Sequence, residues 1–552
     1  MRSFAGQKVD VCIVGSGAGG APLAFEIARA GMSVVVLEKG PWYTAKDFSH
    51  DEIAINRRTF WSPALGDEPR LWKDSQAPAR KSSNGWISTC VGGGTVHMSG
   101  FFYRLHPEDF RMRERFPDLE AEHENWPITY DELSPYYDRV ETEVGVSGLA
   151  GQYPFEPPRR GPFPDPPLAS NPIAALIDHG ARSLGLHPFP TPRAIVSRPR
   201  EGRAGCAYCD FCGSYGCEVD AKSSTAVALL PRAIASGNCE VRTPAMVFDV
   251  VVDKSGRATG VRYFDAAGQI VEQHAALVCV SATAIESARL LLNSTSPAFP
   301  HGLANRNGHV GRHLHFSTLG KGHGEFERAK LPADMQKDDG VHFLQRSLQD
   351  FYFVKDMPGY NKGGTHCFVL PPRGPIFASE RIAGRQGTQW GAPLMQALHR
   401  YFHEVREIDF EVFGEYLPNS QSFVTVDNSV QDKWGLPVSS VQAIHREEDV
   451  KMSRFLVDRG LEVLTAAGAV RTETDSVGGT TSILQHGTCR FGDDPKTNVL
   501  NRWCQTHDVK NLFVVDGSFM PTSGGVATTM TIMANSFRVA DYLVGRRKSG
   551  AL

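Results

Sequence analysis

The run Val9–Val14 (VDVCIV) and the turn Gly15-Ser16-Gly17-Ala18-Gly19-Gly20 that follows it decide the fold of this 552-residue chain. The run is short, apolar and rich in β-branched residues, and an alanine-rich helical pattern follows the turn as far as Ala30. A second apolar run, Ser33–Leu37, ends at Glu38. This order of strand, glycine turn, helix, strand and acid predicts a Rossmann-like unit that binds a dinucleotide.

Each residue of the motif has a physical role. Gly15 makes the tight turn, Gly17 lets the backbone approach a pyrophosphate, and Gly20 lets helix and strand pack closely. The helix N-terminus faces the phosphates, where its partial positive charge is favourable. Glu38 stands where a carboxylate binds an unphosphorylated ribose, which favours FAD or NAD over NADP.

Composition excludes several classes of protein. The chain is 41% hydrophobic and 22% charged, as expected of a globular protein with more than one core. Its formal net charge of −3 offers no basic surface for nucleic acid or an anionic membrane. The apolar runs are strand-sized, so we expect no membrane span. The N-terminus, MRSFAGQ, lacks the pattern of a leader peptide, so we expect no self-encoded export, and export on a partner stays open.

Three further motifs resemble the glucose-methanol-choline (GMC) oxidoreductases. They are the stretch Cys90–His97 (CVGGGTVH), the stretch Trp126–Tyr130 (WPITY) with Pro135–Tyr137, and the C-terminal run HGTCRFGDDPKTNVLN with NLFVVDGSFMPTSGG. They occur in the family's order along nearly the whole chain. The resemblance implies FAD as the cofactor, a flavin domain built from discontinuous segments, and oxidation of alcohols by hydride transfer to the flavin.

The same resemblance assigns residues to the cofactor. It implies that the glycine triplet brings the backbone against the flavin, and that an acid near the C-terminus contacts the ribityl and phosphate region. His97 stands where some members carry a histidine bonded covalently to the flavin ring. Glu286 lies in a looser match to a second family signature. The residues assigned in this way are Gly92, Gly93, Gly94, His97, Asp516, Gly517, Ala527 and Thr528.

Four of the eleven cysteines lie within twelve residues: Cys206, Cys209, Cys212 and Cys217. Their segment, GCAYCDFCGSYGCEVDAK, shows neither helical nor strand periodicity. Closely spaced cysteines of this kind are a signature of iron–sulfur clusters. Two alternatives stay open: a zinc site with four thiolates and a pair of disulfides.

The segment looks like the cysteine-rich insertion of bacterial membrane-linked sugar and sugar-acid dehydrogenases of the GMC family. That likeness implies a [3Fe-4S] or [4Fe-4S] cluster that passes electrons to an external acceptor, a cytochrome or a quinone, and leaves room for a small escort subunit. With three irons, one of the four cysteines would be spare. The seven scattered cysteines suit a reducing place of folding, in the cytoplasm, with the final location open to a partner-linked periplasmic or membrane-associated site.

The catalytic pair of the family is not present at its usual positions. Alcohol oxidation needs a base for the hydroxyl proton and a second polar group to orient the substrate oxygen. The family's histidine position holds Leu484, and its second position holds Ala527. If the segment 483–487 is extended, His486 projects on the same side as Leu484 and becomes the predicted base.

Two residues are predicted to orient the substrate in place of Ala527: Thr528, and more weakly Asn535, which lies farther along a predicted helix. His313 and His315 alternate with apolar residues as in a strand and are candidates for the pocket wall. Glu415 and Asn419 look like the substrate-domain strand of sugar dehydrogenases in the family.

The sequence therefore predicts an α/β (α+β) fold with a Rossmann-like FAD-binding domain and a separate substrate domain on an antiparallel sheet. The FAD-binding domain covers residues 1–318, including a covering excursion at about 101–189 and the cysteine-rich loop 204–222. Residues 319–478 form the substrate domain, and residues 479–552 return to the first.

The predicted function is an FAD-dependent dehydrogenase that oxidises a hydroxyl of a sugar, glycoside or polyol and relays electrons through the cluster. Two alternatives remain: an alcohol oxidase that uses O₂ and carries a structural metal loop, or a flavin subunit that transfers electrons or scaffolds an assembly without oxidising alcohols. The departures at Leu484 and Ala527 permit the second alternative.

Overall fold

The computed structural model describes residues 3–56, 61–74, 77–119, 122–337, 346–354, 362–478 and 483–550. The predicted start of the C-terminal return, 479–482, lies outside these residues. In the part that is described, no helix is both long enough and apolar enough to cross a bilayer.

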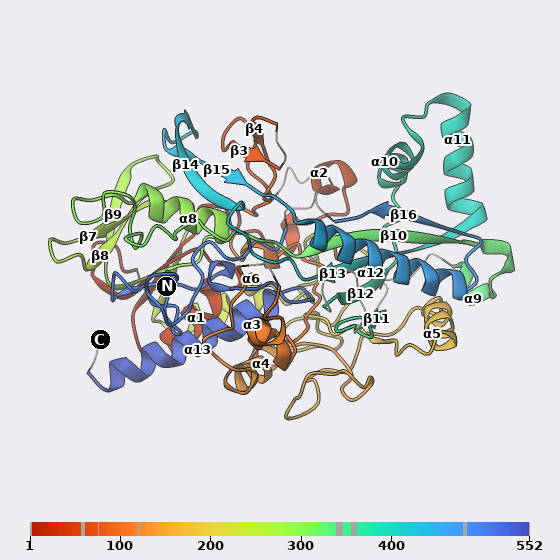
Figure 1. Ribbon diagram of the computed structural model, residues 1–552, viewed down its shortest axis with the longest axis horizontal. Helices are drawn as coiled ribbons and strands as arrows, with labels where there is room; N and C mark the ends of the chain where they lie inside the picture. The colour runs from red at the N-terminus through yellow and green to blue at the C-terminus, as the bar shows by residue number, and fades with distance from the viewer. Residues whose placement is uncertain are drawn as a thin grey trace.

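The chain folds around two main sheets (Figure 1). The first has seven strands in the order β6-β2-β1-β9-β8-β7, with β17 also paired to β9. The strands around β1 run parallel, and β8 and β7 extend the sheet antiparallel. The seven strands are β1 (Val9–Val14), β2 (Val34–Leu37), β6 (Cys239–Arg242), β7 (Met246–Val252), β8 (Ala258–Phe264), β9 (Ile270–Val280) and β17 (Leu512–Val514).

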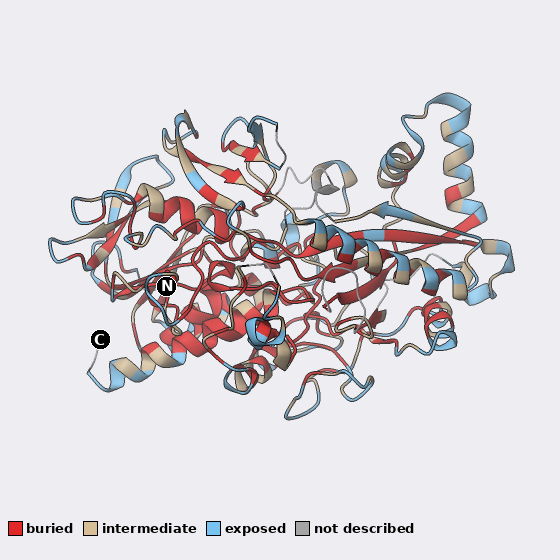
Figure 2. Ribbon diagram, viewed as in Figure 1, coloured by how far each residue is buried: buried red, intermediate tan, exposed pale blue. Residues whose placement is uncertain are grey.

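Helices cover this parallel sheet and bury its apolar strands. Helix α1 (Gly20–Arg29) packs against α13 (Thr529–Lys548), and α13 packs in turn against α4 (Tyr130–Val144). Thr129 and Glu132 cap the start of α4 reciprocally, which explains the WPITY motif as a helix start. Figure 2 shows the buried interior of α1, α13 and the strands beside them. Strand β1 is almost wholly buried, as expected when both faces are covered.

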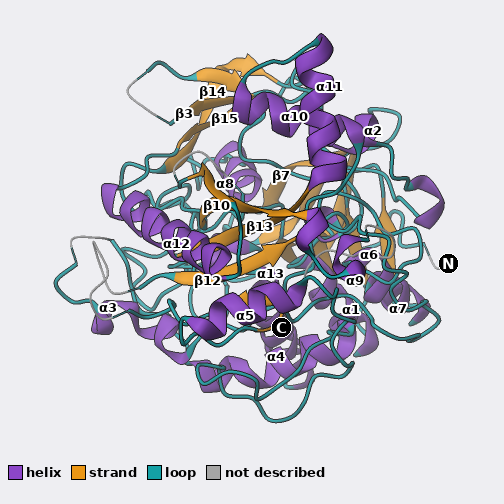
Figure 3. Ribbon diagram, turned by 90° about the vertical axis from the view of Figure 1, so that its right-hand side faces the viewer, coloured by secondary structure: helices purple, strands orange, loops and turns teal. Residues whose placement is uncertain are grey.

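The second sheet is antiparallel throughout and has six strands in the order β16-β10-β13-β12-β11-β5. Helix α12 (Glu447–Ala466) packs on β10, β12 and β13 and supplies Leu456 and Val457 to a separate hydrophobic core. Figure 3 shows this sheet and its helix. The strands are β5 (Phe189–Pro190), β10 (Thr318–Glu327), β11 (Arg346–Leu348), β12 (Gly364–Val369), β13 (Val405–Gly414) and β16 (Arg471–Ser476).

The predicted fold class is confirmed: a Rossmann-like unit and an antiparallel sheet stand side by side. A smaller sheet joins β14 (Phe423–Gln431) and β15 (Pro437–Gln442) to β3 (Arg70–Lys73) and β4 (Arg80–Ser82). This sheet pairs strands from both predicted domains. The predicted domain limits stay a prediction. The proline-rich stretch 155–172 forms no helix or strand.

Three more helices belong to the two units. Helix α8 (Ala284–Asn293) follows β9 in the first unit, whereas α10 (Pro375–Gln386) and α11 (Gly391–His399) project from the second unit beyond the sheet (Figure 1). Residues of α8 and α10 both line the cavity described next.

Candidate active site

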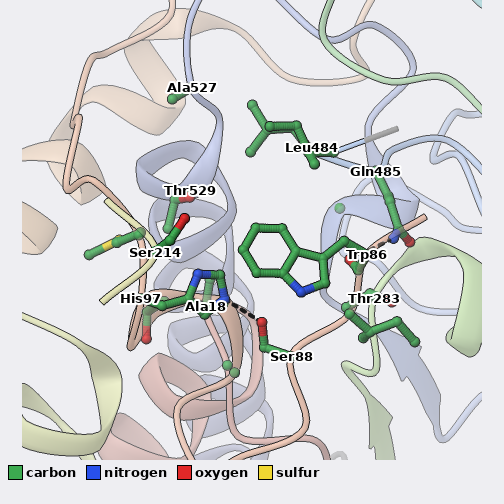
Figure 4. A pocket seen from close by; sticks show the side chains of 18 of the residues that line it. Ala18, Trp86, Ser88, His97, Ser214, Thr283, Leu484, Gln485, Ala527 and Thr529 are labelled. Atoms are coloured by element: carbon green, nitrogen blue, oxygen red, sulfur yellow. Dashed lines mark hydrogen bonds between the residues drawn. The ribbon is translucent and has the colours of Figure 1, made fainter. Parts of the chain in front are cut away.

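A cavity of about 820 Å³ reaches from the glycine turn after β1 to the antiparallel sheet. Its walls come from the glycine turn, the triplet turn near residue 93, the cysteine-rich loop, the start of α8, strand β13 and the C-terminal return. Figure 4 shows part of it, with Trp86, His97, Leu484 and Ala527 around the same space. Segments far apart in the sequence thus converge on one site.

The nucleotide end of the cavity has the glycine geometry that the motif predicts. Gly15 has φ +93°, and a Cβ there would lie 2.2 Å from the carbonyl oxygen of Ser281, so only glycine fits. Gly17 and Gly94 line the cavity. A Cβ on Gly17 would meet nothing nearer than 3.8 Å, and one on Gly94 nothing within 4 Å. Their backbones therefore face open space that a ligand can approach closely.

Two buried hydroxyl groups belong to residues at this end of the cavity. The hydroxyls of Ser281 and Thr283 are buried and have no hydrogen-bond partner among the described residues, and both side chains line the cavity. Thr283 also has φ +79°, a strained backbone that occurs most often at functional sites. Together with the open glycines, these groups fit a bound dinucleotide.

Glu38 lines the cavity and is held in place by the turn. Its carboxylate accepts hydrogen bonds from the Ser16 amide (3.1 Å), the Ser16 hydroxyl (2.7 Å) and the Gly40 amide (3.2 Å). Burial raises its pKa against these hydrogen bonds. The turn therefore holds the carboxylate in the cavity wall, and its binding to a ribose stays a prediction.

Gly20 and Gly92 do not line the cavity. A Cβ on Gly20 would lie 2.0 Å from the Gly15 carbonyl oxygen, so this glycine serves the packing of α1 on β1. Gly92 has φ +95° and donates its amide to the Ser16 hydroxyl (3.0 Å). Of the predicted triplet, only Gly93 and Gly94 face the cavity, while Gly92 forms the turn that presents them.

Two acids from other segments complete this end. Asp516, which lines the cavity with Gly517, accepts hydrogen bonds from the Ser518 amide (2.8 Å) and the Ser287 hydroxyl, and burial raises its pKa. Burial also acts on Glu286, but Arg289 and Arg70, each 3.2 Å away, lower its pKa to about 2. Glu286 is thus a fixed anion in the wall.

His97 lines the wall beside the cysteine-rich loop. Its Nε2 hydrogen-bonds the Ser88 hydroxyl (dashed in Figure 4), and its ring lies 4.3 Å from the Trp86 ring. Its carbonyl oxygen accepts the amide of Ser214 (2.8 Å), and Ser214 itself lines the cavity. The backbone of this residue, whose imidazole is predicted to face the flavin, is therefore hydrogen-bonded directly to the cysteine-rich loop.

The predicted base and its partner come together on another wall. His486 is fully buried, lines the cavity, and places its Nε2 2.7 Å from the Thr528 hydroxyl. Its Nδ1 has no partner in the described part of the chain. Burial, and then the neighbouring His315, lower its pKa well below 6.5, so the imidazole is neutral. A neutral imidazole with one bonded and one open nitrogen can accept a proton.

Leu484 and Ala527 line the same wall and contribute only apolar surface (Figure 4). The expected extended conformation of 483–487 is wrong at Leu484, which has φ +57°. His486 pairs instead with His315 in an isolated bridge. The turn at Leu484, rather than strand alternation, is what brings His486 to the cavity.

Asn535 is not part of the site, contrary to prediction. Seven residues of helix place it about 10 Å beyond Thr528 along α13. There it is buried, and its amide donates to Cys504 Sγ (3.1 Å) while its oxygen accepts from Arg538 (3.0 Å).

Four further candidates also lie off the cavity. His315 sits behind His486, with ring centroids 5.3 Å apart, and His313 pairs with Glu122 (2.8 Å). The side chain of Asn419 donates to the Ile444 carbonyl (3.2 Å). Glu415 is fully buried in a charge network that is described below.

The four cysteines of the loop are free thiols: Cys209 is exposed and the other three are half-buried. Cys206 Sγ accepts the Tyr208 amide (3.4 Å), and Cys217 Sγ accepts the Lys222 amide (3.5 Å). The Lys222 ammonium is buried behind them and donates to the carbonyls of Cys212 (2.7 Å) and Tyr215 (2.6 Å). No disulfide joins these four cysteines, so the structure does not show the disulfide alternative in this loop.

Among the described residues, only His323, Glu325 and Glu407 bring three metal-binding side chains within 4.8 Å of one another. Arg400 pairs with Glu325 (3.0 Å), and Arg381 (2.8 Å) and Arg385 (3.0 Å) pair with Glu407. These arginines already neutralise the carboxylates, so the group is an ion-pair network.

Sequence analysis did not single out several residues of the wall. Trp86 and Gln485 line the cavity without belonging to a motif, and Thr283 lies in the stretch around Glu286 without having been assigned a role. Gln485 donates to the Gly85 carbonyl (3.0 Å) and accepts the Ile285 amide (3.2 Å), so it ties three segments together. The feature that distinguishes Thr283 is its positive φ, which only the structure reveals.

Comparisons with known proteins agree with this geometry. Family models described as GMC oxidoreductase match residues 77–318 and 418–536, and one described as FAD binding domain matches residues 10–49. The chain is 34% identical to 2-methyl-1,2-propanediol dehydrogenase of Mycolicibacterium austroafricanum, over 98% of this chain and 96% of that protein. It is 31% identical to 6'''-hydroxyparomomycin C oxidase of Streptomyces lividus, over 98% and 92%.

A solved structure shares the fold. Pyridoxine 4-oxidase from Mesorbium loti superposes with a TM-score of 0.66 at 18% identity, covering 97% of this chain and 99% of that one.

Proposed function

Because the chain belongs to the GMC oxidoreductases, which bind FAD and act on alcohol or sugar hydroxyls, we propose that it is a dehydrogenase with an iron–sulfur relay. Its substrate is a sugar, glycoside or polyol, and its electrons leave through a cluster held by Cys206, Cys209, Cys212 and Cys217. One observation carries the proposal: the cysteine-rich loop itself forms cavity wall, at Gly213–Tyr215, and is bonded to His97 through Ser214.

The residues of this chain supply binding and proton chemistry. The glycine turn, Glu38 and Asp516 hold the dinucleotide, and bound FAD supplies the acceptor for the hydride that leaves the carbinol carbon. The hydroxyl proton goes to His486, whose open Nδ1 can take it while Thr528 fixes the ring through Nε2. The apolar surface of Leu484 and Ala527 keeps water from this wall.

The loop geometry favours a cluster over a single zinc ion. Four thiolates at about 2.3 Å from one zinc would lie about 3.8 Å from each other. No three sulfurs of the loop lie within 4.8 Å of one another. A cluster sets several irons between its thiolates and spaces them more widely.

Other features of the loop also suit a cluster. Amide hydrogen bonds to cysteine sulfur, such as those at Cys206 and Cys217, tune cluster potentials. Tyr208, Asp210 and Ser214 hold φ between 54° and 69°, a strained backbone that needs a reason to persist.

An acceptor has a place to approach. Cys209 lines a second cavity of about 300 Å³ together with Phe211 and Arg373. We propose that a separate acceptor, a cytochrome or a quinone, takes electrons there. A small escort subunit belongs to the same proposal.

The alternative is an oxidase in which O₂ takes the electrons from flavin and the loop is structural. One of the two relatives is a dehydrogenase by name and the other an oxidase, so they favour neither alternative. Stoichiometric hydrogen peroxide under air would support the oxidase.

The deciding experiment is an anaerobic visible spectrum with iron and acid-labile sulfide analysis, before and after adding sugars and polyols. We expect several irons per chain, a broad shoulder over the flavin bands, and bleaching by one substrate class. Flavin without iron or sulfide would overturn the relay. Flavin that no alcohol bleaches would instead support a non-catalytic electron-transfer or scaffold subunit.

A further inference from the structure

A lysine and two carboxylates meet in the core, away from the cavity. Lys362, Asp109 and Glu415 are each fully buried, and the Lys362 ammonium pairs with Asp109 and, at 2.7 Å, with Glu415. One positive and two negative charges out of water are costly unless every polar atom is satisfied. Such a group is retained when it fixes something that apolar side chains could not.

The network holds one turn of the backbone through Glu415 and Tyr352. Glu415 accepts the amides of Ser523 (2.7 Å) and Gly524 (2.9 Å). Tyr352, which donates its hydroxyl to Asp109 (2.7 Å), accepts the amide of Gly525 (3.0 Å). Three consecutive N–H groups, at Ser523–Gly525, are therefore held by this network.

The turn is closely packed against its neighbours. Gly524 has φ +70°, and a Cβ there would lie 2.3 Å from Leu105 Cδ2. A Cβ on Gly525 would lie 2.8 Å from both Gly364 Cα and Tyr352 Cε2. The network and the close packing thus act on the same three residues.

The turn leads directly into the catalytic wall. Ala527 and Thr528 follow it, both line the cavity, and Thr528 bonds His486 before α13 begins at Thr529. The network therefore fixes the chain immediately before the residue that orients the base. It also joins four segments: the excursion that carries Asp109, the start of β12, the end of β13 and the C-terminal return.

We propose that Glu415, held by Lys362, is a positioning residue for alcohol oxidation: it fixes the Ser523–Gly525 turn and through it the Thr528–His486 pair. Glu415 does not touch the cavity, so it acts only through the turn. The inference rests on alcohol-driven flavin reduction and not on the iron–sulfur relay.

The chain offers a matched control. Glu415→Gln and Asp109→Asn each remove one negative charge from the same network without changing side-chain shape, but only Glu415 accepts the turn amides. We expect Glu415→Gln to lower the limiting rate of anaerobic flavin reduction, per bound flavin at saturating substrate, by at least about tenfold with little change in KM. Asp109→Asn should change it less than about threefold, although both lower Tm.

A wild-type rate in Glu415→Gln, or equal rate losses in both variants, would overturn the inference, because the network would then serve stability alone. If Glu415→Gln does not fold, Ser523→Ala and Tyr352→Phe decide. Ser523→Ala removes the hydroxyl that donates to Glu415 (2.9 Å), and Tyr352→Phe removes the hydroxyl that donates to Asp109 and accepts the Gly525 amide. Wild-type reduction rates in both would overturn the inference. If the unaltered protein shows no flavin bleaching with any alcohol, the proposed function fails, which is a distinct result.

Discussion

The two histidines that line the cavity have opposite surroundings. His97 contacts Ser88, Trp86 and the backbone of the cysteine-rich loop, whereas His486 contacts Thr528 beside the apolar Leu484 and Ala527. In the first case the backbone carbonyl accepts an amide of the loop that carries four thiols, and in the second the ring keeps one nitrogen without a hydrogen-bond partner in the described part of the chain. One wall suits electron exit and the other suits proton transfer.

The largest expected effect tests the proton-transfer wall. His486→Ala should lower the rate of anaerobic flavin reduction by about 10²–10⁴, because it removes the general base. The rate is measured by stopped-flow bleaching of the flavin. His366→Ala is the matched control. His366 lies on β12 of the second sheet and is equally buried, but its ring bonds the Leu456 carbonyl of α12. An unchanged rate in His486→Ala would remove this residue from the mechanism.

The next effect tests the electron-exit wall. Cys209→Ser should leave flavin reduction by substrate intact and abolish most of the turnover with an external acceptor, because the proposed relay would lose a ligand. Both rates are measured on the same preparation, with iron content. Cys239→Ser, on β6 outside the loop, is the control. Parallel loss of flavin reduction and turnover in Cys209→Ser would make the loop structural.

Local backbone motifs are what sequence reasoning identified best. The glycine turn, the open backbone at Gly93–Gly94 and the position of Glu38 each depend on residues close together in the sequence. Their geometry therefore follows from the local order of residues. His486 was identified by type, but its approach depends on a left-handed backbone at Leu484 that strand alternation does not include. A leucine gives no sign of such a turn.

Contacts between distant segments could not be predicted from the sequence. The prediction that Asn535 orients the substrate is wrong, because the helix places this residue two turns away from Thr528, where it bonds Cys504. Lys362 carries no motif, and Glu415 was singled out only as part of a substrate-domain strand. Their partners Asp109 and Ser523 lie far away in the chain. Only the folded chain brings these charges together, so no periodicity or spacing could have predicted the network.

A smaller effect separates the two members of the proton-transfer wall. Thr528→Val keeps the shape and removes one hydrogen bond to His486, so flavin reduction should slow by about three- to tenfold, the value of one net hydrogen bond. Thr531→Val on the same helix removes a hydrogen bond to Tyr137 (2.9 Å) outside the cavity and should leave the rate unchanged. Equal rates in the two variants would mean that Thr528 does not orient the base.

The smallest expected effect is the absence of a pH dependence where histidine ordinarily gives one. Burial and His315 lower the pKa of His486 well below 6.5, so the folded protein holds this imidazole neutral throughout the range above that pH. The base form is lost only as the pH falls through the lowered pKa. The limiting rate of flavin reduction should therefore be flat above pH 6.5 and decline only in more acidic solution. A rate that already halves near pH 6.5 would mean that His486 titrates as an exposed histidine does. In that case water would reach the wall formed by Leu484 and Ala527, and the contrast between the two walls would disappear.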